Sequence, residues 1–275
     1  MLEIPEATTI ARQLIVEVSG RSVTRALAGR VPHGYVFWSR SPADYGRILP
    51  GLPIDDAVAY GGIVEIQLDN WRLAFSEGAR LRWIPPGSPL PQRDQLQLEL
   101  DDGSALVCTV DVAAVISLTQ EGRNDDPRYL AALAAVSPLT DAFTVEHLSR
   151  LMAAVPGRLS VMELLTMQQR IPGFGSGCLS DVAFLAEIHP RRRIDTLTPG
   201  ELPELHRLLV ETVRQMTASG GRDTQFDLYG NPGGYRTLLS AKTHATPCPR
   251  CGVVITRKVF HGETVYACPG CQATN

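Results

Sequence analysis

The chain has 275 residues, of which 44% are hydrophobic and 20% are charged. This balance is typical of globular proteins and excludes wholesale disorder, collagen-like repeats and a fibrous coil. The sequence contains no run of about 18 apolar residues, and its first residues lack the basic start and apolar stretch of a secretory signal. We therefore expect a protein that makes no membrane contact and is located in the cytoplasm.

The basic residues are unevenly distributed along a chain whose net charge is −3. Of the 26 basic residues, 24 are arginine, and the two lysines are Lys242 and Lys258. Chemistry that needs a lysine amine, such as a Schiff base, is therefore excluded from the first 240 residues. Residues 1–130 carry 12 basic and 17 acidic side chains, whereas residues 131–275 carry 14 and 12. Nucleic-acid contacts should accordingly favour the second half.

The first part of the chain is predicted to form a helix and a set of strands. Residues 6–18 have the pattern of a helix that packs on a sheet. Strands are expected over residues 31–38, 62–68, 71–75, 80–84, 95–100 and 105–110. Turn residues punctuate these segments, as in an antiparallel β-sandwich.

A polar segment over residues 119–128 precedes a change to helical periodicity. Helices are expected over residues 144–155, 160–169, 178–187 and 198–218. Ser160 and Glu163 have the spacing of a capping box at the start of the second helix. A glycine-rich turn over residues 171–177 separates that helix from the next, which predicts a helix-two-turns-helix arrangement.

The C-terminal cysteines carry the strongest chemical signal. Cys248 and Cys251 form one Cys-x-x-Cys pair, and Cys268 and Cys271 form another after sixteen intervening residues. Two such pairs can place four thiolates at the corners of a tetrahedron, as in a zinc ribbon. The alternatives are two disulfides, which are unusual in a chain without a secretion signal, or four unrelated cysteines. We expect one structural zinc ion that holds this segment folded.

Two further features are weaker when each is taken alone. The turn that contains Gly175, Ser176 and Gly177 could bind a nucleic-acid phosphate, because consecutive N–H groups at a helix N-terminus attract anions. A glycine turn between helices is also a common tight connection. Glu3 and Glu6 precede or begin the first helix, where carboxylates often do no more than complement the helix dipole.

Taken together, these features resemble the formamidopyrimidine-DNA glycosylase and endonuclease VIII family of base-excision repair enzymes. The similarity covers essentially the whole chain and is more specific in its second half. The matching segments are Leu2-Glu3-Ile4-Pro5-Glu6, Pro172-Gly173-Phe174-Gly175-Ser176-Gly177, Ala186-Glu187-Ile188-His189-Pro190, Ala218-Ser219-Gly220-Gly221 and Cys268-Pro269-Gly270-Cys271-Gln272.

The resemblance implies an α+β multidomain fold. It places an N-terminal β-sandwich glycosylase-like domain with a packed helix at residues 1–125 and a helical helix-two-turns-helix DNA-binding domain at residues 135–240. A four-cysteine zinc ribbon follows at residues 244–275. The implied partner is damaged or modified duplex DNA, bound by a nucleoid-associated monomer.

The sequence departs from the family pattern at positions that the family uses for function. The family's N-terminal proline nucleophile corresponds to Leu2, and leucine is too large for the usual removal of Met1. The hairpin lysine corresponds to Gly62, the void-filling methionine lies near Glu77, and the loop that supplies the void-filling Arg and Phe corresponds to residues 111–116. In the second half, a phosphate-binding Asn corresponds to Ser176, and an Arg of the zinc hairpin corresponds to Glu263, which should repel DNA locally.

Three interpretations follow from this pattern. The first is a DNA repair glycosylase with a diverged active site that releases a damaged or modified base, with weak or absent AP-lyase activity. The second is a catalytically inactive DNA- or damage-binding protein with the same fold, and the third is a zinc-stabilised protein without a nucleic-acid role. We favour the glycosylase because Glu3 lies at its family position and the helix-two-turns-helix segment is well kept. The candidate catalytic residues are Glu3, Leu2, Met1 and Glu6, and the candidate DNA-binding residues are Gly175, Ser176, Gly177, Arg191, Arg222 and Arg236.

Overall fold

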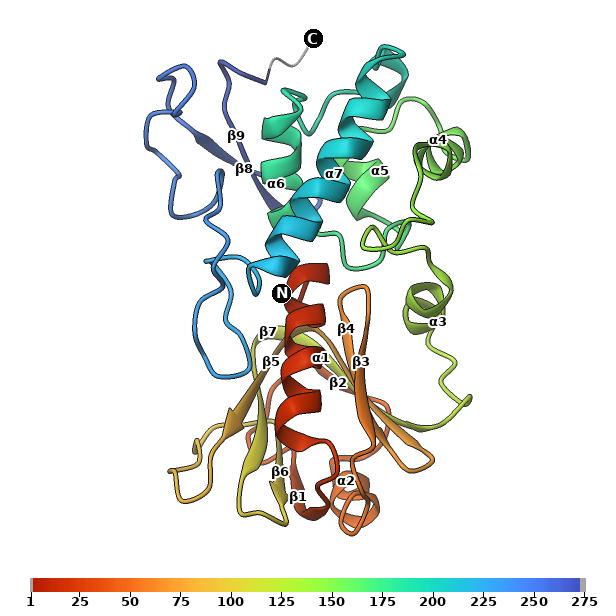
Figure 1. The fold of residues 1–275 in the computed structure, drawn as a ribbon, viewed down its shortest axis with the longest axis vertical. Coiled ribbons are helices and arrows are strands. Elements are labelled where there is room, and N and C mark those ends of the chain that lie inside the picture. The colour runs from red at the N-terminus through yellow and green to blue at the C-terminus, as the bar shows by residue number, and fades with distance from the viewer. Residues whose placement is uncertain (1, 273–275) are drawn as a thin grey trace. The chain divides into compact units, whose positions relative to one another are not determined.

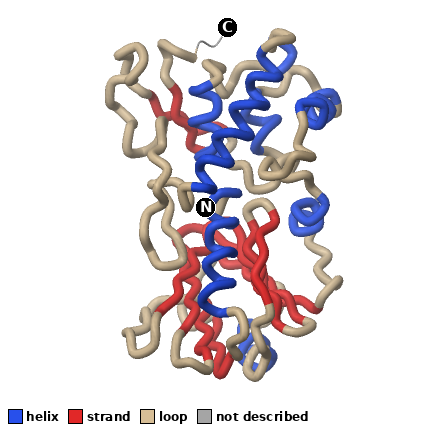
Figure 2. The backbone as a smooth tube through the Cα atoms, viewed as in Figure 1, coloured by secondary structure: helices blue, strands red, loops and turns tan. Residues whose placement is uncertain are grey.

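A computed structural model describes residues 2–272, which divide into two compact units. The first unit runs to Leu133 and also takes in Phe226–Pro232, while the second holds Ala134–Gln225 and the chain from Gly233 onward. Strands dominate the first unit and helices the second (Figure 2). The α+β class predicted from the sequence is therefore confirmed. Among the described residues, no helix is both long and apolar enough to cross a membrane.

The first unit is built on a seven-stranded sheet. In chain order its strands are β1 (Val23–Ala28), β2 (Val36–Trp38), β3 (Asp56–Tyr60), β4 (Ile63–Leu68), β5 (Trp71–Ile84), β6 (Leu96–Leu100) and β7 (Ala105–Gln120). The order across the sheet is β1-β6-β7-β5-β4-β3, with antiparallel neighbours, and β2 pairs with β7 in parallel.

The two longest strands, β5 and β7, run through both halves of this sheet. Their register shifts between Glu77 and Ala79. Before the shift β5 also pairs with β4, and beyond it β7 pairs with β6. A bulge of this kind bends a strand and increases its twist. The two halves can thus enclose one core although all seven strands belong to a single sheet.

Helix α1 (Ile4–Val18) packs on the sheet, as the sequence predicted, and lies in front of the strands of this unit in the view of Figure 1. Ala7, Ile10, Leu14 and Val18 recur on one face at helical spacing, and each is buried in the core. Helices α2 (Pro42–Ile48) and α3 (Pro127–Ala134) complete the unit.

The segment Phe226–Pro232 joins the first unit although its neighbours in the sequence belong to the second. Leu228 is fully buried in the core around α1. Its N–H donates to Gln13 Oε1 at 2.9 Å, and its carbonyl accepts from the Trp83 N–H at 3.0 Å. Tyr229 donates its hydroxyl to Glu17 at 2.7 Å. The segment is therefore fixed to both α1 and β5.

The second unit contains the predicted helices and a short hairpin. Its elements are α4 (Val145–Ala153), α5 (Val161–Thr166), α6 (Ser176–Leu185), the 3-10 turn Ile194–Thr196, α7 (Glu201–Ala218), β8 (Thr256–Phe260) and β9 (Glu263–Ala267). The capping box predicted at Ser160 and Glu163 is present in full. It supplies partners for backbone N–H groups that the first turn of α5 would otherwise leave unsatisfied.

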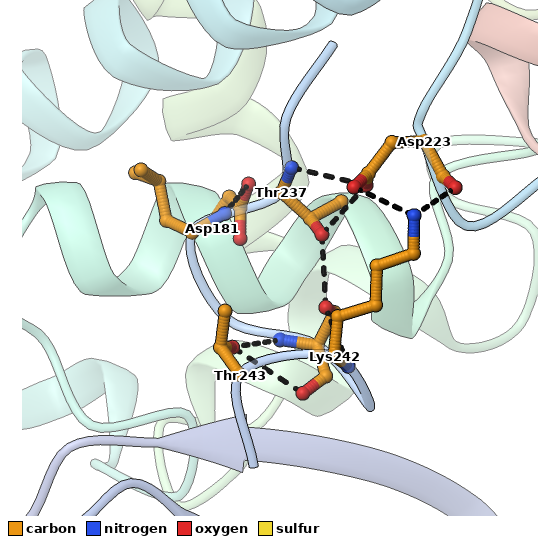
Figure 3. A network of polar contacts seen from close by, with 7 residues as sticks. Asp181, Asp223, Thr237, Lys242 and Thr243 are labelled. Carbon is orange, nitrogen blue, oxygen red and sulfur yellow. Dashed lines mark hydrogen bonds and ion pairs between the residues drawn. The ribbon is translucent and has the colours of Figure 1, made fainter. Parts of the chain in front are cut away.

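Asp181 of α6 fastens the loop that leads to the C-terminal cysteines (Figure 3). Its carboxylate accepts the N–H groups of Leu238 and Leu239 at 2.9 and 2.8 Å. In the adjoining network, Asp223 accepts from the hydroxyl of Thr237 at 2.8 Å and from Lys242 Nζ at 2.8 Å (Figure 3). Burial raises the pKa of Asp181 to about 6 from its ordinary value of 3.8.

Replacing Asp181 with asparagine should loosen this loop. The amide retains one acceptor oxygen and turns an NH₂ group toward a backbone N–H, at a cost of about 1–3 kcal/mol. We expect faster hydrogen–deuterium exchange over residues 235–243 in Asp181→Asn, while Asp141→Asn, which changes a fully solvated carboxylate of the same unit, leaves exchange there unaltered. Equal exchange in both variants would contradict the assigned role.

The same residue should impose a pH dependence on the stability of the second unit. Because folding raises the pKa of Asp181, the folded state binds this proton more strongly than the unfolded state does. The stabilisation that results is present below about pH 4 and is lost as the pH rises through about 6. The wild type should therefore be more stable than Asp181→Asn at pH 4, and this difference in stability should shrink by pH 7. Hydrogen–deuterium exchange of both proteins, compared at each pH, measures the difference.

Candidate functional site

The two predicted carboxylates lie at the start of α1. Glu3 is the N-cap residue, with extended backbone angles, and Glu6 lies in the first helical turn just after Pro5. Proline suits this turn because its missing N–H would have no helical partner there. Glu3 and Glu6 are 3% and 4% exposed, and each has interaction partners.

Leu2 lies directly before these carboxylates and belongs to the hydrophobic core. Its N–H donates to the carbonyl of Glu77 at 2.7 Å. In the chain as printed this nitrogen is part of a peptide bond, so it is not a nucleophile. Met1, the other candidate in this stretch, lies outside the described residues.

Glu77 occupies an unusual backbone position at the shift in β5. Its φ is +61°, a left-handed conformation that non-glycine residues rarely adopt. A side chain on the following Gly78 would lie 2.6 Å from the carbonyl oxygen of Ala113. Glycine is therefore needed at position 78 for the two long strands to approach. Backbone strain of this kind often marks functional sites.

The carboxylate of Glu77 pairs with Arg128, which follows the first residue of α3. Arg128 Nη1 lies 3.0 Å from Glu77 Oε1, and 64% of the arginine side chain is exposed. The sequence predicts a linker over residues 119–128, and no motif in this segment marks the arginine. Its position depends on a contact across 51 residues, and no local pattern reveals such a contact.

A buried carboxylate anchors the neighbouring Tyr129. The tyrosine hydroxyl donates to Glu65 Oε2 at 2.6 Å, and Arg72 Nε lies 3.9 Å from the other oxygen. Burial raises the pKa of Glu65, which is 1% exposed. The ring of Tyr60 contacts that of Tyr129 edge to face. The first turn of α3 is thus held firmly against the β3–β4 hairpin.

In the second unit, the three predicted residues of the glycine-rich turn meet at the N-terminus of α6. Gly175 is the N-cap residue, and Ser176 and Gly177 begin the helix. The Ser176 hydroxyl donates to Glu263 Oε2 at 2.9 Å. A carboxylate from the first residue of β9 therefore lies where backbone N–H groups and the helix dipole favour an anion.

The predicted arginines occupy different environments. Arg191 and Arg236 are exposed, and the Arg191 guanidinium lies 4.8 Å from the centre of the Phe260 ring. Arg222 was expected at a DNA-binding surface, but it is only 2% exposed. Its charge opposes the effect of burial on the pKa of Asp181. We therefore correct its assignment to the interior of the unit.

The four C-terminal cysteines converge, with all four Sγ atoms within 4.8 Å of one another. Cys248 and Cys271 are 3.8 Å apart at sulfur, and Cys251 and Cys268 are 3.4 Å apart. Tetrahedral zinc with Zn–S bonds of about 2.3 Å needs S–S separations of about 3.8 Å. The thiolates present therefore fit a metal of this kind.

Local hydrogen bonds form the two turns that carry these sulfurs. The N–H of Gly252, which has a φ of +76°, donates to the Cys248 carbonyl at 2.9 Å. Gln272 accepts the Cys268 N–H at 2.8 Å and donates to the Ile188 carbonyl at 3.0 Å. The residue that follows the last cysteine thus fixes one turn to the helical part of the unit.

Comparison with known proteins finds relatives named as DNA glycosylases that are similar to this chain over its whole length. It is 28% identical to the formamidopyrimidine-DNA glycosylase of Chloroflexus aurantiacus, and the similarity covers 100% of this chain and 98% of that protein. It is 29% identical to the enzyme of that name from Symbiobacterium thermophilum, covering 99% and 89%. No family model matches the chain.

Solved structures agree on the fold. The Lactococcus lactis Fpg protein in complex with DNA containing an abasic site has a TM-score of 0.81 at 21% identity, covering 98% of this chain and 99% of that one. The MutM (Fpg) protein from Thermus thermophilus has a TM-score of 0.81 at 22% identity, covering 99% of both chains.

The fold defines a helix-two-turns-helix protein with a C-terminal cysteine ribbon. Its three parts are the sheet of the first unit, the helices of the second unit and the hairpin that carries the four cysteines. The full-length similarity to curated relatives makes the assignment more specific. The chain is therefore similar over its whole length to formamidopyrimidine-DNA glycosylases, and it resembles the formamidopyrimidine-DNA glycosylase and endonuclease VIII family.

Proposed function

We propose that the chain is a DNA repair glycosylase that releases a damaged or modified base from duplex DNA. The similarity to curated formamidopyrimidine-DNA glycosylases over the whole chain supports this function. The structural observation that carries it is the position of Glu3, a buried carboxylate at the N-terminus of α1. The damaged base would have to leave the helical stack to reach this residue.

Glu3 is the proposed catalytic residue. A carboxylate at this position can accept a proton from a water that attacks the sugar carbon C1′. It can also stabilise the positive charge that develops on the sugar as the base departs, as carboxylates do in glycoside hydrolysis. Glu6, one helical turn further on, adds a second negative charge to the same helix end.

We propose weak or absent AP-lyase activity for this chain. Strand cleavage through a Schiff base requires an amine, and Leu2 contributes a peptide nitrogen that is already bonded to the Glu77 carbonyl. The hairpin position Gly62 contributes no amine either. Base release by hydrolysis needs neither group.

DNA contacts in the second unit are assigned to the N-terminus of α6 and to exposed arginines. Gly175, Ser176 and Gly177 provide a phosphate-binding helix terminus. Arg191 and Arg236 add positive charge at the surface. Glu263 opposes this binding, because its carboxylate already accepts the Ser176 hydroxyl.

One zinc ion bound by Cys248, Cys251, Cys268 and Cys271 is the proposed cofactor, and its role is structural. When bound, zinc would supply the bonds that hold the hairpin folded, since this short segment has little core of its own. The separations between the sulfur atoms support tetrahedral coordination.

A catalytically inactive DNA- or damage-binding protein is the second candidate. The burial of Leu2 in the core, with its nitrogen already hydrogen-bonded, favours this alternative. The two candidates differ in whether any lesion base is released.

Glu3→Gln should separate these candidates. In a panel of lesion-bearing duplexes, we expect base release by the wild type and a loss of about 10²–10⁴-fold in the variant, because the amide cannot accept the proton. DNA affinity should not fall, and Glu99→Gln, on β6 of the same unit, should retain activity. DNA binding by the wild type without release from any duplex would favour the second candidate. No salt-dependent binding would exclude both.

Glu263→Gln should strengthen DNA binding. The substitution removes a negative charge beside Ser176 while its amide oxygen can still accept the hydroxyl. We expect about a fivefold gain in affinity, equivalent to about 1 kcal/mol. The control is Glu211→Gln, an exposed carboxylate on α7, which should bind DNA like the wild type. An unchanged affinity for Glu263→Gln would argue against phosphate binding at this helix terminus.

Metal removal should unfold the ribbon selectively. Elemental analysis should give one zinc per chain in the wild type and in Cys108→Ser, which changes a cysteine buried in the sheet of the first unit. Chelation or Cys268→Ser should accelerate hydrogen exchange over residues 246–272 but not in α1. Retention of protection after complete loss of metal would show that zinc does not hold this segment folded.

A further inference from the structure

We infer that Arg128 binds a DNA phosphate at the glycosylase site and that Glu77 and Tyr129 position it there. The inference rests on the proposed function and adds a DNA contact in the first unit. The sequence pattern of the family did not identify this arginine.

Glu77 lies close to the start of α1. Its carbonyl accepts the Leu2 N–H at 2.7 Å, so this residue lies beside the position that precedes Glu3. Glu77 still pairs with Ala114 in the ladder between β5 and β7, and its left-handed backbone lies directly before the register shift. The backbone of Glu77 therefore lies next to the end of α1 at which the proposed catalytic carboxylate begins the helix.

Glu77 and Arg128 form an ion pair that is open to solvent. Their charged groups are 3.0 Å apart, yet 64% of the arginine side chain and 37% of the glutamate side chain are exposed. Exposed ion pairs contribute little to folding stability. A phosphate can therefore replace or join the glutamate as a partner, since the planar guanidinium offers several donors to oxyanions.

Hydrogen bonds hold the backbone that carries Arg128. Asp126 Oδ1 accepts the N–H groups of Arg128 and Tyr129 at 2.7 and 3.1 Å. The hydroxyl of Tyr129 is fixed to the buried Glu65. The Cα atom of Arg128 is thus held in place while its side chain reaches into solvent, an arrangement that suits a binding residue.

Acidic side chains outnumber basic ones in the part of the chain that forms this site. Glu3, Glu6 and Glu77 gather at or next to the N-terminus of α1, and residues 1–130 carry five more acidic than basic side chains. A DNA backbone that approaches this end of α1 meets negative charge. Arg128 supplies positive charge directly against Glu77, the most exposed of these three carboxylates.

The test measures DNA affinity as a function of salt for Arg128→Gln, with a duplex that contains a tetrahydrofuran abasic-site analogue as the probe. Loss of one phosphate contact should lower the slope of log K against log salt by about 1, and affinity at low salt should fall about fivefold. Arg128→Lys keeps the charge and should restore most of the slope. Arg47→Gln, which changes an exposed arginine paired with Asp44 on α2, should match the wild type.

Glu77→Gln distinguishes phosphate binding from a structural role. If Arg128 binds phosphate, Glu77→Gln should raise the affinity for DNA, because the arginine is freed from the carboxylate. If the ion pair only stabilises the bulge, Glu77→Gln and Arg128→Gln should lower the affinity for DNA to a similar extent. Equal salt slopes for the wild type and Arg128→Gln, with both variants folded by circular dichroism, would overturn the inference. If the wild type still releases bases, the proposed function would stand. Absence of salt-dependent DNA binding by the wild type would overturn both.

Discussion

The hydrogen bond from the Leu2 N–H to the Glu77 carbonyl joins the start of the chain to the bend of its longest strands. It fixes the backbone just before Glu3, the N-cap residue of α1. The bend exists because Gly78 allows the backbone of β7 to approach and because Glu77 adopts a left-handed conformation. The position of the proposed catalytic carboxylate thus depends on the same feature that lets one sheet enclose a core.

The sequence allowed most elements of the fold to be predicted, and the errors in the sheet have physical causes. Residues 71–75 and 80–84 were expected as separate strands, but they form the single strand β5, because the bulge at Glu77 interrupts the apolar alternation without ending the pairing. Strand β1 was missed because a register shift between Val23 and Arg25 disturbs its alternation. Strand β3 (Asp56–Tyr60) was also missed, since its apolar residues follow one another in a short run and do not alternate with polar ones.

The candidate site could be predicted only where its chemistry is local in sequence. Closely spaced pairs of cysteines and a glycine turn before a helix can be recognised from neighbouring residues. The contact between Ser176 and Glu263 spans 87 residues, and the one between Arg128 and Glu77 spans 51. Such contacts follow from the tertiary arrangement, and so does the burial of Arg222, which a charged sequence position does not reveal.

The segment Phe226–Pro232 has a consequence for the order in which the molecule can be assembled. Leu228 completes the core around α1 through a bond to Gln13 that closes 215 residues of chain. During synthesis from the N-terminus, the sheet and α1 can form early, but their core stays open until the helices of the second unit have been made. Contacts at such large sequence separation slow folding, because chain entropy is lost before they form. The first unit thus starts to fold first, but its core is completed only after most of the chain has been synthesised.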